Sequence, residues 1–184
     1  MTQKTFIQIR IYFIGIITIG IWSLLLWNHF HDGVLSHHIL HREDLPSISN
    51  WWGGLLLPLL TLFLTYQIQK RIFNQNNDSK IQPSILRPVI LGFFSALLFG
   101  LMLALFFTQW NPNVSGYMMY SLFLLALFFP IYRAECLLGF VIGMTYSIGV
   151  VLPTIAGSVL ALIVFIIYKY VRTVILFIIR KIIK

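Results

Sequence analysis

Charged residues are scarce in this sequence: they make up 10% of the 184 residues, whereas hydrophobic residues make up 59%. Soluble domains carry roughly 25% charged residues, so this chain has too few charges to cover a water-facing surface. The mean hydropathy of +0.88 agrees with that deficit. The composition therefore excludes an ordinary soluble domain and predicts one all-α transmembrane domain over residues 1–184.

Several chemical signatures are also missing. Cys136 is the one cysteine, which excludes an intramolecular disulfide or a CxxC redox pair and suggests a buried structural thiol. The sequence has neither a G-x-x-x-x-G-K-[ST] nor a G-x-S-x-G motif, so it gives no sign of nucleotide-driven or serine-nucleophile chemistry. Arg10, Arg87, Arg133 and Glu135 lie near the ends of apolar runs and none lies near a middle, which argues against an ordinary proton pump or antiporter.

Long apolar runs, in contrast, are abundant. A helix that crosses the hydrocarbon core needs about 20 apolar residues. The run from 134 to 171 covers 38 residues, which is too long for one crossing, so we divide it at Pro153. The six predicted transmembrane spans cover residues 6–28, 51–68, 85–107, 116–132, 134–151 and 153–171.

The basic residues give the orientation. With six spans, twelve of the thirteen basic residues fall on one side of the membrane, and Arg42 alone falls on the other. The positive-inside rule then predicts that both termini are cytoplasmic, in what we expect to be a bacterial inner membrane. The twelve are Lys4, Arg10, Lys70, Arg71, Lys80, Arg87, Arg133, Lys169, Arg172, Arg180, Lys181 and Lys184.

The net charge of +8 points to contact with an anionic partner, either lipid headgroups or nucleic acid. Because the basic residues lie in short segments between apolar runs, we expect them to meet anionic lipid headgroups and not nucleic acid. The basic tail at 172–184 is the clearest case, either as an interfacial helix or as an extension of the last span.

The polar segment 29–50 is predicted to be an extracytoplasmic loop. It holds all five histidines and three of the five acidic residues of the chain. We expect Ser36 to cap a short helix from His37 to about His41, on which these two histidines stand at i and i+4. That spacing lets two imidazoles reach one Zn²⁺ or Fe²⁺ ion.

The other polar residues of this loop complete the predicted site. His38 lies one turn before His41, and His29, His31 and Asp32 are candidates for the remaining ligands. Glu43 and Asp44 are candidates for a general base or for acceptors that orient the ligands. The alternative is a structural loop that binds no metal, contacts lipid phosphates and changes charge at around pH 6–7.

Small residues recur at every fourth position in two predicted spans. This spacing lets helix backbones approach closely, so it predicts helix packing, with a groove for a lipid or small solute as the alternative. The same stripes are candidates for contact with a membrane protein partner. They are Gly92, Ala96 and Gly100 in one span, and Gly139, Gly143 and Ser147 in another.

Three functions stay open from these observations. The first is a membrane metalloprotein, a hydrolase or oxidoreductase acting on lipid at the outer leaflet. The second is a small-solute transporter or its membrane substrate-binding subunit. The third is a non-catalytic accessory subunit of a membrane complex. Whether the protein is an enzyme is therefore left undecided by the sequence.

Overall fold

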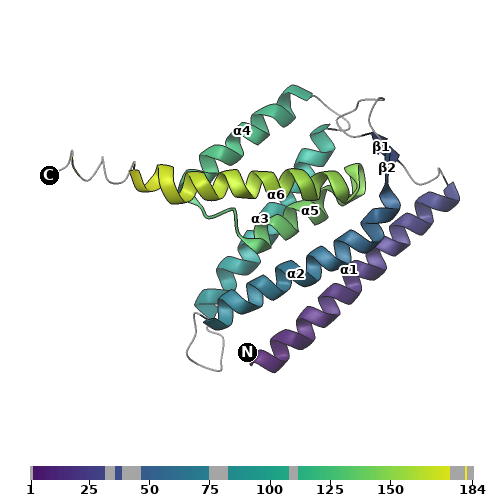
Figure 1. The fold of residues 1–184 in the computed structure, drawn as a ribbon, viewed down its shortest axis with the longest axis horizontal. Helices are drawn as coiled ribbons and strands as arrows, with labels where there is room; N and C mark the ends of the chain where they lie inside the picture. Colours follow the sequence, from purple (N-terminus) through teal and green to yellow (C-terminus); the bar gives the residue numbers. More distant parts are fainter. Residues whose placement is uncertain are drawn as a thin grey trace.

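A computed structural model describes residues 2–31, 36–38, 47–74, 83–107, 112–174 and 181 of the chain. Within these ranges the fold is helical, apart from one small sheet of two strands (Figure 1). The elements are α1 (Gln3–His31), β1 (Ser36–His38), β2 (Ser47–Ser49), the 3-10 helix η2 (Asn50–Trp52), α2 (Gly53–Asn74), α3 (Pro83–Leu105), α4 (Pro112–Phe128), α5 (Ala134–Ile148), α6 (Val151–Ile166) and the π-helical turn η4 (Ile167–Val171).

Three stretches of the described chain are long and apolar enough to cross a membrane: Gln3–His31, Pro83–Leu105 and Val151–Val174. The membrane character expected from the sequence is thus supported. A helix lies in each of the six predicted spans, but α5 has 15 residues and is about 22 Å long. It is shorter than the hydrocarbon core of about 30 Å, so six crossings and the orientation of the termini stay a proposal.

The boundary between α5 and α6 differs from the prediction. The break lies at Gly149, whose φ of 80° is a backbone conformation that suits glycine. Pro153 instead falls in the first turn of α6, where the missing N–H of a proline costs no helical hydrogen bond. The two helices therefore separate a few residues before the proline that was expected to divide them.

The small-residue stripes pack α3 directly against α5. A Cβ added at Gly143 would lie 2.5 Å from the Leu97 carbonyl oxygen, and one at Gly100 would lie 2.7 Å from the Phe140 carbonyl oxygen. Gly139 meets the backbone of α3 in the same way, at Phe93. At these three glycines α3 and α5 pack against each other within the chain, which confirms the packing interpretation there. Contact of the stripes with a membrane protein partner stays a prediction.

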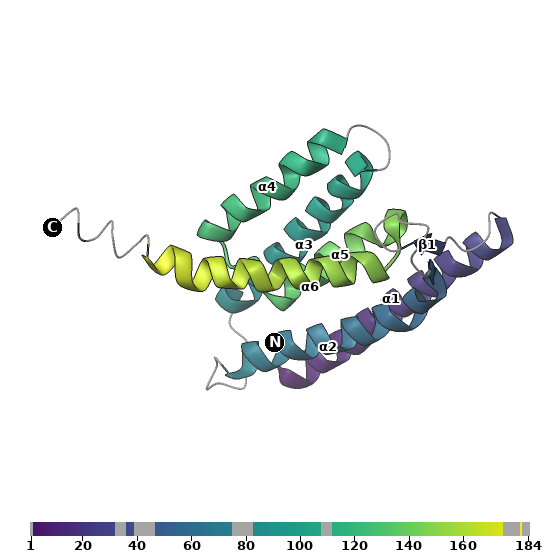
Figure 2. The same cartoon turned by 45° about the horizontal axis from the view of Figure 1, so that its top comes forward.

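The hydrophobic core is arranged around α5. Its members come from α1, α2, α3 and α5 and from the turn at Val150. Figure 2 shows α1 and α2 side by side, next to the group formed by α3, α4, α5 and α6. The buried members of this core are Ile21, Leu25, Leu57, Leu103, Ala104, Phe140, Val141, Met144 and Val150.

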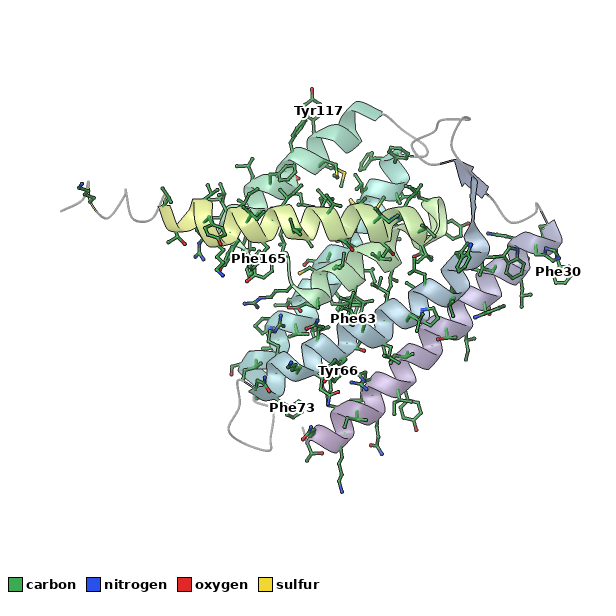
Figure 3. All side chains as sticks on the ribbon, viewed as in Figure 1. Phe30, Phe63, Tyr66, Phe73, Tyr117 and Phe165 are labelled. Carbon is green, nitrogen blue, oxygen red and sulfur yellow. The ribbon has the colours of Figure 1, made fainter. Side chains whose placement is uncertain are left out.

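The outer faces of the helices are apolar as well. Large apolar side chains project outward along α1, α2, α3, α4 and α6 (Figure 3), and Tyr117 on α4, for example, is 73% exposed. In water such continuous apolar surface would be unstable, whereas lipid is a suitable solvent for it. The exposed faces therefore indicate contact with membrane lipids.

The glycine contact generates a stability prediction. Gly143→Ala should lower the free energy of unfolding by about 1–3 kcal/mol, because the added methyl group meets backbone that cannot move aside. Gly20→Ala is the control, since nothing lies within 4 Å of a Cβ at that position. Thermal unfolding of the detergent-purified variants measures both effects. An unchanged midpoint for Gly143→Ala would contradict the close α3–α5 contact.

Candidate functional site

Glu135 is a buried acid in the first turn of α5, with 1% of its surface exposed. Its Oε1 accepts a hydrogen bond of 2.8 Å from Nη2 of Arg71, which belongs to the last turn of α2 and is 27% exposed. The partial positive charge at the start of α5 also favours the carboxylate. Gly92 on α3 makes room for it, since a Cβ there would lie 3.3 Å from Cγ of Glu135.

Arg10 lies on α1 and contacts α2, the helix that also carries Arg71. Its Nη1 donates a hydrogen bond of 2.5 Å to Oε1 of Gln69 on α2. The guanidinium also lies over the Tyr66 ring, 6.0 Å from the ring centroid. Arg10 is half-buried, and both of these contacts come from α2.

Two buried polar atoms in this region have no hydrogen-bond partner among the described residues. They are Oε2 of Glu135 and Nε of Arg10. Leaving a buried donor or acceptor unpaired costs about 1–3 kcal/mol, and more for a charged group. The two atoms are thus buried at a cost that no contact within the described residues offsets.

Both side chains line one cavity of about 280 Å³. The cavity lies between α1 and α3, with further walls from α2 and α5, and its lining is otherwise almost entirely apolar. Phe13 and Phe93 pack edge to face across it, with ring centroids 5.8 Å apart. Its lining residues are Phe6, Ile9, Arg10, Phe13, Thr65, Ile68, Leu86, Val89, Ile90, Phe93, Phe94, Glu135 and Leu138.

Part of this lining is exposed on the outside of the bundle. Ile9 is 52%, Ile90 44% and Phe94 60% exposed. Since these apolar side chains face the surroundings of the helices, the cavity opens toward the surface that contacts lipid. Cys136, beside Glu135, is half-buried and lines a second, apolar cavity of about 170 Å³ among α3, α4, α5 and α6.

The predicted histidine ligands are only partly described. His29 contacts the Trp51 ring at 5.8 Å between centroids, while His31 stacks on Trp27 at 4.1 Å. Residues two apart on a helix face different sides, so these two imidazoles do not converge. Within the described residues no group of three or more His, Cys, Asp and Glu side chains is placed to hold a metal ion.

The prediction that a helix begins at His37 is wrong for the residues that the structure describes there. Residues Ser36–His38 form strand β1, which pairs antiparallel with β2 so that His37 lies opposite Ile48. The backbone is therefore extended there, and the i, i+4 spacing that joined His37 to His41 no longer applies. Asp32, His41, Glu43 and Asp44 lie outside the described residues, so the metal site and its base stay predictions.

The pair of Arg71 and Glu135 was missed by the sequence reasoning. The two residues are 64 positions apart, and each lies near the end of an apolar run, where a charge is ordinary. One signal was present: Glu135 is the sole acidic residue within the six predicted spans. An acid inside a membrane segment is by default a candidate functional residue.

Comparisons of the chain with protein-family models, with curated proteins and with solved structures found no match in any of the three. Function must therefore be argued from the site itself.

Removing Arg71 tests the buried ion pair. Arg71→Ala should lower the free energy of unfolding by about 3 kcal/mol, because it leaves the Glu135 carboxylate buried and uncompensated. The double variant Arg71→Met/Glu135→Met should recover most of that loss. Unfolding in detergent measures both, with Lys70→Ala as the exposed control. A double variant that loses at least as much stability as Arg71→Ala alone would contradict a direct pair.

Proposed function

We propose that the protein is a membrane-embedded binding protein, a carrier or the substrate-binding subunit of one, whose ligand is an amphiphile. The observation that carries this proposal is the cavity lined by Arg10 and Glu135. Its accessible surface is apolar, and Arg10 and Glu135, each with one buried polar atom that has no partner among the described residues, border it. Binding sites for small molecules have this character, with a few polar groups in an apolar pocket.

The surroundings of the cavity support an entry from lipid. Its exposed lining residues are Ile9, Ile90 and Phe94, all of them apolar. A water-soluble solute would have to cross this apolar rim, whereas an amphiphile partitions there already. A ligand with a polar head and an apolar tail thus matches both the inside of the cavity and its opening.

We further propose six crossings of a bacterial inner membrane with both termini cytoplasmic. The start of α1, the end of α2 and the start of α3 lie at one end of the molecule (Figure 1). Lys4, Lys70 and Arg87 belong to those helix ends, and basic residues favour the cytoplasmic side. On this orientation Arg10 and Glu135 lie toward the cytoplasmic leaflet.

Filling the cavity tests the proposal. Ile90→Trp should reduce ligand retained through purification at least about fivefold, because the indole occupies space that the ligand needs. Leu91→Trp is the matched control: Leu91 is the next residue, is 69% exposed and does not line the cavity. Quantitative mass spectrometry of lipids and metabolites extracted from each purified variant gives the measurement. Equal retention by both variants would refute this site.

A second candidate function is metal binding by the histidines of the segment 29–50. The pairing of β1 with β2 places the backbone of His37 and His38 just before the start of α2, and His29 contacts Trp51 at that same end. His31 donates from Nδ1 to the Trp27 carbonyl oxygen at 3.1 Å, since a carbonyl only accepts. Such a bond leaves Nε2 as the coordinating nitrogen.

Elemental mass spectrometry of protein without a histidine tag tests whether the histidines of the segment 29–50 bind a metal ion. A metal site predicts about one Zn or Fe ion per chain, lost in the double variant His37→Ala/His41→Ala, because each imidazole supplies one of the few ligands. Lys70→Ala, at the other end of α2, should keep the ion. Absence of metal from all three proteins would leave the loop with a structural or headgroup-contact role.

A further inference from the structure

We infer that the end of α6 carries a binding site for the headgroup phosphate of an anionic phospholipid. Two cations form the site, each held over an aromatic ring. We call it the basic–aromatic cluster, and its members are Lys169, Arg172, Phe165, Tyr168 and Tyr132. None of the five lines the cavity of the proposed function, so this inference goes beyond that function and does not depend on it.

Three aromatic rings form the base of the cluster. Tyr132, in the turn before α5, meets Phe165 on the last turn of α6 edge to face, with ring centroids 5.2 Å apart (Figure 3). The Tyr132 ring also lies 5.6 Å from the ring of Tyr168 on η4. Helix α4 packs against η4 as well. The base of the cluster is therefore held by segments that are distant in the sequence.

Two cations lie over these rings, each four positions after its ring. Nζ of Lys169 lies 5.3 Å from the ring centroid of Phe165, and Cζ of Arg172 lies 4.6 Å from that of Tyr168. Both distances fall within the roughly 6 Å at which a ring face attracts a cation. Residues three positions apart on a helix are neighbours, and like charges there repel each other. An anion that binds both cations relieves this repulsion.

No carboxylate in the described part of the chain pairs with these two cations. Glu135 is the single acidic residue in those ranges, and its Oε1 is bonded to Arg71. Lys169 is exposed and Arg172 is half-buried, so a ligand from outside can reach both. The cluster lies near the end of the apolar stretch Val151–Val174. In a helix that crosses the membrane, that end lies in the headgroup layer.

The backbone that carries the cluster has an unusual geometry. The N–H of Arg172 donates to the carbonyl oxygen of Ile167, five positions earlier, whereas an α-helix bonds to the residue four positions earlier. Such π-helical turns are rare and are frequently found at functional sites. The backbone thus marks as a candidate site the same turn that carries Lys169, independently of its charge.

The chemistry of the two cations favours phosphate. A guanidinium presents N–H donors in a fork that matches phosphate oxygens, and an ammonium adds a compact positive charge. A zwitterionic headgroup brings a cation of its own, which this pair repels, whereas an anionic headgroup does not. Ile166 and Val171, 45% and 43% exposed, offer apolar surface beside the cluster for acyl chains. An anionic phospholipid matches both features.

Two phospholipids with identical acyl chains test the inference. Delipidated wild-type protein in detergent is titrated with phosphatidylglycerol and with phosphatidylcholine, and bound lipid is counted by native mass spectrometry. We expect the first glycerol lipid to bind about tenfold more tightly than the choline lipid, because it alone carries a net negative charge. Added ammonium acetate should reduce this preference, since salt screens exposed charges.

Matched pairs of variants assign the preference to the cluster. Lys169→Gln/Arg172→Gln should reduce it to about twofold or less, because both phosphate donors are lost. Lys4→Gln/Lys70→Gln removes the same charge from two exposed positions at other helix ends and should retain it. Tyr168→Leu should weaken the glycerol lipid about threefold, because Arg172 loses its ring, whereas Tyr168→Phe keeps a ring and should bind normally.

Each contrary result overturns the inference. Equal binding of the two lipids by wild-type protein would show that the headgroup charge is not read, and this comparison needs no variant to fold. Equal losses in the two double variants would show general attraction to basic residues and no defined site. Glycerol phosphate that competes as well as the whole lipid would show a site for a soluble anion. None of these outcomes bears on Ile90→Trp, which reports on the separate cavity.

Discussion

The backbone contact between α3 and α5 is the constraint on which the rest of the structure depends. Gly100, Gly139 and Gly143 let the two helices touch without side chains between them. In lipid, apolar side chains gain nothing by leaving their solvent, so close packing is the main force that joins helices. This contact places α5 in the middle of the bundle, where α2 and α6 also pack against it.

The position of α5 explains how a carboxylate comes to be buried. The helix lies in the middle of the bundle, so its first turn and Glu135 are enclosed by neighbouring helices. Charge in such surroundings is tolerated only when it is paired. Arg71 supplies one partner from α2, and the carboxylate oxygen left over is the feature from which the binding proposal follows.

The two ends of the molecule carry different chemistry. One end holds the basic helix termini, the buried pair and the cavity, whereas the other holds His29, His31, the small sheet and the tryptophans at the start of α2. The cavity and the small sheet thus lie toward opposite ends of the helix pair formed by α1 and α2.

The sequence by itself determined the membrane class, the helical segments and the close-packing stripes, because these follow from local composition and spacing. Backbone groups in lipid must bond within their own helix, so an apolar run such as 85–107 predicts a helix without any tertiary information. Tertiary structure alone decided that Glu135 meets Arg71 across 64 residues, and that strand pairing would hold His37 out of a helix. Long-range contacts of this kind depend on how whole helices cross and pair, which no local pattern of residues encodes.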